Sequence, residues 1–158
     1  MDKKEKLILV IDDEVEIRNI IKEILSDEGY KTLTAASAKE AKKILEEQSP
    51  DMVFLDIWMP EQDGISLLDE WSKKGKQDFP VIMISGHATI ETAIEATKLG
   101  ASDFIEKPIS IEKLLNTIDS VFSKKIENEK EDILTYIIKN GKKFSDIFKN
   151  IVKEDLED

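Results

Sequence analysis

Polar side chains that can bind a metal ion and a phosphoryl group follow four short apolar runs of this sequence. Asp12 and Asp13 follow one of these runs, and Asp56 ends a second. Ser85 ends a third run, and Lys107 follows a fourth. Carboxylates without histidine or cysteine beside them suit a hard cation such as Mg²⁺, and a hydroxyl and an ammonium can bind phosphoryl oxygens. These residue types indicate phosphoryl chemistry assisted by a divalent cation.

Asp56 is the best candidate for the nucleophile in that chemistry. Three carboxylates at one place would repel one another, and a divalent cation would relieve the repulsion. One carboxylate oxygen could then attack a phosphoryl donor and form an acyl phosphate. Asp56 is central and stands alone at the end of its run, between Pro50 and Pro60, whereas Asp12 and Asp13 form a pair.

An alternation of strands and helices must position these residues. Apolar runs alternate with stripes of helical period from residue 7 to about residue 123. The predicted strands cover residues 7–11, 31–35, 53–55, 81–84 and 103–106, and the predicted helices cover 15–25, 38–48, 65–74, 89–99 and 111–122. Ser37 and Ser110 are predicted N-caps of two of these helices. The buried face of the last predicted helix carries Ile111, Leu114, Leu115, Ile118 and Phe122.

This alternation predicts an α/β fold with a five-stranded parallel sheet and helices on both faces. Alternation alone leaves the strand order open. The flavodoxin-like, doubly wound order 2-1-3-4-5 would bring the strand that precedes Asp12 beside the strand that ends at Asp56, at the point where the strand order reverses. Ligands bind at that point of an open parallel sheet, so we expect the polar strand ends to form one site.

The C-terminal part of the chain has a different pattern, so we predict two parts, a domain at 1–123 and an extension at 124–158. Residues 124–130 are mostly charged and either continue the fifth helix or form a solvated linker. Apolar residues at 133–138 predict a short helix that ends near Asn140 and Gly141. A second apolar stripe predicts another short helix at 144–152. Such helices must pack on the domain, on each other or on a second chain.

Composition excludes several classes of function. The chain has 158 residues with a net charge of −11, so we expect direct binding neither to nucleic acid nor to anionic membranes. It has no cysteine, so disulfides and thiolate chemistry are absent. The apolar run near the N-terminus is too short for a signal peptide or a membrane span. We therefore expect a cytoplasmic protein.

The pattern of these residues resembles the receiver domain of bacterial response regulators, the phosphoacceptor module of two-component signalling. The resemblance covers roughly residues 7–123. The matching motifs are Asp12-Asp13, Asp56-Ile57-Trp58-Met59-Pro60-Glu61-Gln62-Asp63-Gly64, Ser85-Gly86, Phe104 and Lys107-Pro108. The resemblance implies a fold like that of CheY. It also implies that a sensor histidine kinase phosphorylates Asp56, and that the domain is a phosphoacceptor with at most weak autophosphatase activity rather than an enzyme.

The resemblance also implies roles for the other residues. Asp13, Asp56 and the backbone carbonyl of Trp58 would hold Mg²⁺, with Asp12 assisting through a water molecule. Ser85 and Lys107 would bind the phosphoryl group, and the peptide bond between Lys107 and Pro108 would be cis. Ser85 and Phe104 would form the switch pair. Phosphorylation would then remodel the surface around the fourth helix, fifth strand and fifth helix, and a homodimer is the expected active assembly.

A finer resemblance concerns the stretches from Ser85 to Ala93 and from Phe104 to Pro108. They are similar to receivers of the NtrC/NtrX branch of sigma-54-dependent activators, which continue into an ATPase and a DNA-binding domain. No Walker A pattern occurs in this sequence. We therefore expect either a transcriptional regulator without its output domains or a stand-alone receiver that acts as a phospho-relay or an interaction module.

Two other classes fit the sequence less well. A phosphatase with an aspartyl-phosphate intermediate would carry a second acid two residues after the nucleophile, where Trp58 stands. A nucleotide or flavin binder would need a phosphate-binding loop after the first strand, where Asp12, Asp13 and Glu14 would repel phosphate. The single-residue features have ordinary interpretations as well: we expect His87 to be an exposed loop residue, and Trp58 and Trp71 to be packing residues.

Overall fold

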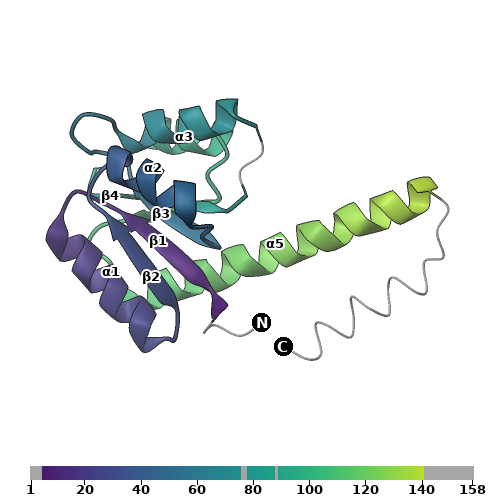
Figure 1. Ribbon diagram of the computed structural model, residues 1–158, viewed down its shortest axis with the longest axis horizontal. Coiled ribbons are helices and arrows are strands. Elements are labelled where there is room, and N and C mark those ends of the chain that lie inside the picture. The colour runs from purple at the N-terminus through teal and green to yellow at the C-terminus, as the bar shows by residue number, and fades with distance from the viewer. Residues whose placement is uncertain (1–4, 76–77, 88, 141–158) are drawn as a thin grey trace.

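The computed structural model of the protein describes residues 5–75, 78–87 and 89–140. Strands and helices alternate along this part of the chain, as the sequence predicts (Figure 1). The strands are β1 (Leu7–Ile11), β2 (Lys31–Ala35), β3 (Met52–Asp56), β4 (Val81–Ser85) and β5 (Asp103–Glu106). The helices are α1 (Val15–Asp27), α2 (Ala38–Glu47), α3 (Gly64–Lys73), α4 (Ile90–Lys98) and α5 (Ile111–Asn140).

The five strands form one parallel sheet in the order β2-β1-β3-β4-β5. This order confirms the doubly wound fold that the sequence predicts. Ile11, the last residue of β1, lies opposite Leu55 of β3. The residues that follow β1 and end β3 therefore meet at the carboxyl edge of the sheet, at the point where the strand order reverses.

Helices cover both faces of the sheet, with α1 and α5 on one side and α2 and α3 on the other (Figure 1). Alternate residues of β1 contribute to two cores. Ile8 and Val10 belong to the core that contains Ile21 of α1 and Ile118 of α5. The neighbouring residue Leu9 belongs to the core that holds residues of α2, α3 and α4. Strands β3 and β4 are buried over their whole length, as expected for the centre of a parallel sheet.

Local hydrogen bonds fix the helix starts. Ser37 Oγ accepts a hydrogen bond from the backbone N–H of Glu40, and Ser110 Oγ accepts one from Lys113, which confirms both predicted caps. Trp71 packs edge-on against Phe79 with ring centroids 5.3 Å apart, as predicted for a packing residue.

The last helix differs from the prediction. α5 runs without a break from Ile111 to Asn140, so residues 124–130 continue the fifth helix, and the predicted short helix at 133–138 is part of it. The reason is local, because no glycine or proline interrupts this stretch and its charged residues are good helix formers. Ile111 is 60% exposed rather than buried, since the first turn of α5 lies at the edge of the domain.

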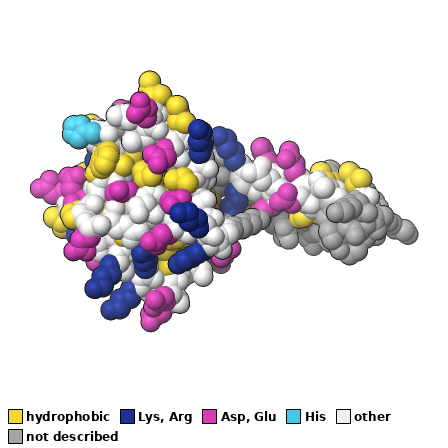
Figure 2. Space-filling view, turned by 90° about the horizontal axis from the view of Figure 1, so that it is seen from above, with side chains coloured by type: hydrophobic (Ala, Val, Ile, Leu, Met, Phe, Trp, Pro, Cys, Tyr) yellow, Lys and Arg dark blue, Asp and Glu magenta, His cyan; other side chains and the backbone are white. Residues whose placement is uncertain are grey.

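The C-terminal half of α5 projects from the domain (Figure 1). The predicted stop at Gly141 and the predicted helix at 144–152 lie outside the described residues. Although α5 is 30 residues long, neither it nor any other described helix has an apolar stretch that would span a membrane. On the face shown in Figure 2, acidic side chains lie among basic and apolar ones.

Candidate functional site

The carboxyl edge of the sheet gathers the polar residues that the sequence singled out. Asp12 follows β1, Asp56 ends β3, and both are almost completely buried. Carboxylate oxygens of Asp12, Asp13, Glu14 and Asp56 lie within 4.8 Å of one another. The structure thus brings together the acid pair and the candidate nucleophile, which are more than forty positions apart in the sequence.

Lys107 enters this acidic cluster from the loop after β5. Its Nζ lies 3.0 Å from Asp12 Oδ2, 2.8 Å from Glu14 Oε1 and 3.6 Å from Asp56 Oδ1. The backbone N–H of Lys107 donates to the carbonyl oxygen of Ser85 at 2.9 Å, which ties the loop to the end of β4. The bond between Lys107 and Pro108 is cis, as the resemblance implied.

Electrostatics in the cluster are dominated by burial. Desolvation, followed by the charge of Asp12, raises the pKa of Asp56 to about 7, although Lys107 opposes the shift. Desolvation also raises the pKa of Asp12. Burial acts to lower the pKa of Lys107, but the hydrogen bond to Glu14 and the nearby carboxylates of Asp12 and Asp56 outweigh it and raise that pKa to about 12. The Lys107 ammonium therefore stays charged, while the raised pKa values of Asp56 and Asp12 oppose the ionisation of these two carboxyl groups.

The cluster meets the requirements of a divalent cation. Asp12 Oδ2 is buried and, among the described residues, receives no hydrogen bond of good geometry, although the Lys107 ammonium lies 3.0 Å away. The donor set consists of carboxylate oxygens without histidine or cysteine. Such a set suits Mg²⁺, which prefers oxygen ligands and keeps several waters. The single charge of the Lys107 ammonium does not neutralise four carboxylates, so the excess negative charge favours a divalent cation.

The loop between β3 and α3 approaches the site closely. The backbone N–H of Gly64 donates to Ile57 O at 2.8 Å, and a side chain at Gly64 would bring its Cβ within 2.1 Å of the carbonyl oxygen of Asp56. Only glycine permits this approach. Trp58 is 54% exposed, so the expectation that it is a packing residue is wrong. Its position just past the strand end turns the indole outward, and Nε1 donates to His87 O at 3.4 Å.

Ser85 and Phe104 lie on the neighbouring strands β4 and β5. Ser85 is fully buried, and its Oγ accepts a hydrogen bond from the backbone N–H of His87 at 3.1 Å. Phe104 lies opposite Met83 in the register of β4 and β5 and is half-buried against the core. His87 itself is an exposed loop residue, as predicted. The switch role of Ser85 and Phe104 stays a prediction.

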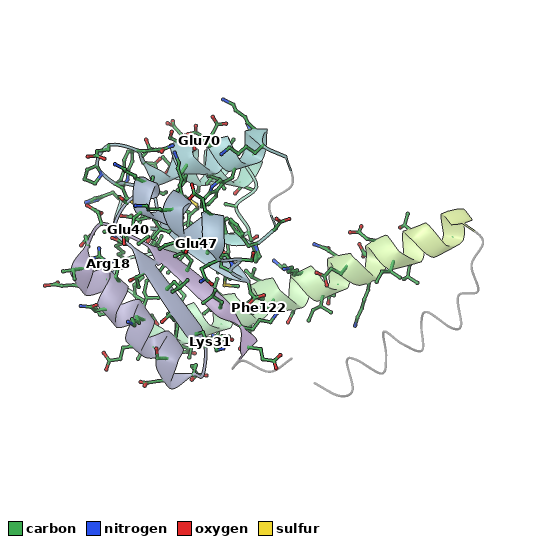
Figure 3. All side chains as sticks on the ribbon, in the orientation of Figure 1. Arg18, Lys31, Glu40, Glu47, Glu70 and Phe122 are labelled. Carbon is green, nitrogen blue, oxygen red and sulfur yellow. The ribbon has the colours of Figure 1, made fainter. Side chains whose placement is uncertain are left out.

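Two residues of the site were not singled out from the sequence. Glu14 forms the shortest of the three ion pairs of Lys107, and its backbone N–H donates to Asp12 Oδ1 at 2.9 Å. Its position directly after the acid pair was an available signal. Arg18 of α1, labelled in Figure 3, donates from Nη1 to the carbonyl oxygen of Asp12 at 2.7 Å. No motif in the sequence pointed to Arg18.

Known proteins are similar to this chain in sequence. The model of the family described as the response regulator receiver domain matches residues 8–119. A protein named as an NtrX-like response regulator in Rickettsia bellii is 51% identical over 110 residues, which cover 68% of this chain and 23% of that protein. A protein named as the transcriptional regulator ycf27 in Cyanophora paradoxa is 38% identical over 121 residues, which cover 77% of this chain and 50% of that protein.

A solved structure gives the same fold. The crystal structure of the receiver domain of NtrX from Brucella abortus has 47% sequence identity and a TM-score of 0.68, and the match covers 73% of this chain and 98% of that one. The chain therefore spans about a quarter to a half of the length of the two curated relatives, whereas 73% of it covers nearly the whole of the isolated receiver domain.

Proposed function

The chain belongs to the response regulator receiver domain family, and we propose that Asp56 accepts a phosphoryl group from a sensor histidine kinase in a Mg²⁺-dependent reaction. The setting of Asp56 carries the proposal. Its carboxylate is 2% exposed at the carboxyl end of β3, belongs to the acidic cluster and lies 3.6 Å from the ammonium of Lys107. A buried carboxylate between other acids and one ammonium is poised for a reaction that changes its charge.

We further propose that Asp13, Asp56 and the backbone carbonyl of Trp58 hold Mg²⁺, with Asp12 assisting through a water molecule. The unsatisfied oxygen of Asp12 and the all-carboxylate cluster support this assignment. When bound, the ion would supply positive charge that offsets the carboxylates and the phosphoryl oxygens. Glu14 lies in the same cluster and adds negative charge that would strengthen cation binding.

The phosphoryl transfer itself uses three side chains. An ionised oxygen of Asp56 attacks phosphorus while the bond from phosphorus to the imidazole nitrogen of the kinase breaks, so the product is an acyl phosphate. Lys107, which already contacts Asp56, offers a compact positive charge to the phosphoryl oxygens. Ser85 lies at the end of the adjacent strand and offers its hydroxyl as a hydrogen-bond donor.

Ser85 and Phe104 then act as the switch. The hydroxyl of Ser85 would give up the hydrogen bond that it accepts from His87 and turn to the phosphoryl group. The ring of Phe104, half-buried on the neighbouring strand, would turn inward into the space that Ser85 leaves. The new phosphoryl contacts favour one of two arrangements, so phosphorylation shifts the equilibrium between them.

The output of the switch is a surface for other proteins. Ile90 and Ile94 of α4 and Ile111 of α5 are 81%, 50% and 60% exposed, which supports a homodimer formed through the α4–β5–α5 face on activation. We propose control of transcription as the cellular role, through that assembly rather than through nucleic-acid contacts of this chain, and the cytoplasm as the location. The relationship to the regulators of Rickettsia bellii and Cyanophora paradoxa supports this role.

Native mass spectrometry of the chain with acetyl phosphate and Mg²⁺ tests the proposal. We expect one added phosphoryl group, its absence when Mg²⁺ is chelated, and its absence in the Asp56→Asn variant. Labelling that persists in Asp56→Asn would assign the acceptor to another residue and overturn the proposal. A change from monomer to dimer in the same spectra would support the dimeric output, whereas phosphorylation without a change in assembly would favour a relay or partner-binding receiver.

A further inference from the structure

The loop between β3 and α3 is held at its base and contains an unusual turn at its tip. The hydrogen bond from Gly64 N to Ile57 O closes the base. At the tip, the backbone N–H of Gln62 donates to the carbonyl oxygen of Pro60 at 2.8 Å, and Glu61 between them has a φ of 68°. This is a γ-turn of the positive-φ kind, which is strained for a residue with a side chain. Other contacts must therefore hold the tip in place.

The side chain of Gln62 supplies those contacts. Its Oε1 accepts a hydrogen bond from Lys42 Nζ of α2 at 2.8 Å, and its Nε2 donates to Glu70 Oε1 of α3 at 2.9 Å. Lys42 Nζ also lies 3.0 Å from Glu70 Oε2, so the three side chains form a closed triangle between two helices and the loop. Figure 3 labels Glu70 on α3 at this side of the molecule.

The chemistry of the triangle fixes the orientation of the amide. An ammonium only donates hydrogen bonds and a carboxylate only accepts them, so the amide oxygen must face Lys42 and the amide nitrogen must face Glu70. The hydrogen bond from Lys42, followed by the one from Gln62, holds the pKa of Glu70 below its usual range. Glu70 is therefore charged at neutral pH, and each side chain of the triangle keeps two partners within it.

We infer that Lys42, Gln62 and Glu70 are positioning residues for the proposed cation site, because they hold the loop that carries Trp58, whose backbone carbonyl is one of the proposed ligands. This inference rests on the proposed function, since it concerns the same Mg²⁺ site. None of the three side chains is a ligand in that assignment. Their contribution is to fix the backbone between Ile57 and Gly64, so that the loop does not have to be ordered when the ion binds.

Gln62→Ala tests the inference without changing any charge. We expect Mg²⁺ affinity, measured by isothermal titration calorimetry on the unphosphorylated protein, to fall about three- to tenfold, less than the loss typical of residues that touch a ligand directly. The Mg²⁺ concentration that gives half the maximal rate of phosphorylation by acetyl phosphate should rise by the same factor, while the rate at saturating Mg²⁺ stays that of the wild type. A role in stability alone would leave that concentration unchanged.

A matched control and a rescue sharpen the test. Lys73 and Asp69 form an ion pair of 3.0 Å within α3 that does not involve the loop, so Lys73→Ala should leave Mg²⁺ affinity at the wild-type value. Combining Lys42→Glu with Glu70→Lys preserves the net charge and allows the Gln62 amide to rotate by half a turn and bond both partners again. This double variant should bind Mg²⁺ like the wild type, whereas Lys42→Ala should resemble Gln62→Ala.

The outcomes separate this inference from the proposed function. If the wild type binds Mg²⁺ and folded Gln62→Ala and Lys42→Ala bind it equally well, the positioning role is wrong and the proposed function stands. A loss of affinity in Lys73→Ala as large as that in Gln62→Ala would also overturn the positioning role. If the wild type itself neither binds Mg²⁺ nor accepts a phosphoryl group, the proposed function fails and the inference fails with it.

Discussion

Strands β3 and β4 each contain an apolar stretch and a polar end, which are equally buried but opposite in chemical character. Residues from Met52 to Leu55 are apolar and lie in the two cores, whereas the next residue, Asp56, is 2% exposed and belongs to the acidic cluster. Ser85 ends β4 in the same way. Packing stabilises the buried apolar region. The buried polar ends instead need opposite charge, which the ammonium of Lys107 supplies and which Mg²⁺ would supply in the proposed function. The contribution of the apolar centre to the free energy of unfolding should therefore be independent of Mg²⁺ and pH. The contribution of the polar strand ends should depend on both.

The largest effect is expected from the centre of the sheet. Phe54→Ala removes a fully buried ring, and the lost burial together with the cavity should lower the free energy of unfolding by about 3–5 kcal/mol. Urea unfolding with and without Mg²⁺ measures this loss. The loss of unfolding free energy should be the same in both conditions. If Mg²⁺ restored the lost stability, the apolar centre would not be independent of the ion, and the distinction from the polar strand ends would be wrong.

Lys107→Ala should have the next largest effect, and it acts at the edge. Removing the ammonium takes away the positive charge beside Asp56, so phosphorylation by acetyl phosphate should slow by about a hundredfold. Stopped-flow or quench-flow kinetics at saturating Mg²⁺ measure the rate. A rate equal to that of the wild type would remove Lys107 from the reaction.

A smaller effect concerns the pH dependence of the metal-free protein. The pKa of Asp56 is raised from 3.8 to about 7 in the folded state, so the folded protein binds a proton more tightly than the unfolded chain does. Stability should fall as pH rises from about 4 to about 7 and stay low above it. Asp56→Asn removes the contribution of Asp56 to this dependence and should be more stable than the wild type at pH 8 by about 1–3 kcal/mol.

Urea unfolding in a chelating buffer at several pH values checks the sign. The gain from Asp56→Asn should shrink towards pH 4, where the wild-type carboxyl is protonated. Saturating Mg²⁺ at pH 8 should stabilise the wild type and leave the variant nearly unchanged. An equal pH dependence in the two proteins would show that the charge of Asp56 does not destabilise the edge.

The smallest effect is expected from the extension at residues 124–158. The core that α5 joins ends at Val121 and Phe122, so a chain that stops at Ser123 should lose less than about 1 kcal/mol of stability and should be phosphorylated normally. Ile133 and Ile138 are exposed on α5, so self-association should change, as sedimentation velocity would measure. Unchanged association would exclude the extension as a contact between copies.

The sequence predicted the fold well because its signals are local. Apolar runs, helical periodicity and the glycines and prolines between elements predicted the strands and helices within a few residues, apart from the C-terminal end of α5, and Ser37 and Ser110 predicted two caps. The edge residues were also predictable, since strand ends in a parallel sheet meet at one edge. The prediction of the elements and the prediction of the residues at the strand ends both depended on patterns within a single segment of the sequence.

The omissions concern contacts between distant segments, and the errors concern the extent of α5 and of the domain surface. Glu14 and Lys107 are 93 positions apart, and Lys42 and Glu70 are 28 apart, so neither pair has a local signature. Charged residues suit both a helix and a linker, so the sequence alone does not determine whether α5 is continuous. The exposure of Ile111 and Trp58 depends on where the domain surface ends, which periodicity alone does not define.

The length of α5 makes it a lever. Residues from Leu114 to Val121 anchor the helix in the core, and the stretch from Lys124 to Asn140 extends beyond it for about 25 Å at 1.5 Å per residue. A tilt of about 5° at the anchor would therefore displace the far end by about 2 Å, roughly the scale of the helix shifts that operate at subunit interfaces. A rearrangement too small to disturb the packing of the sheet becomes a displacement that a neighbouring molecule can detect.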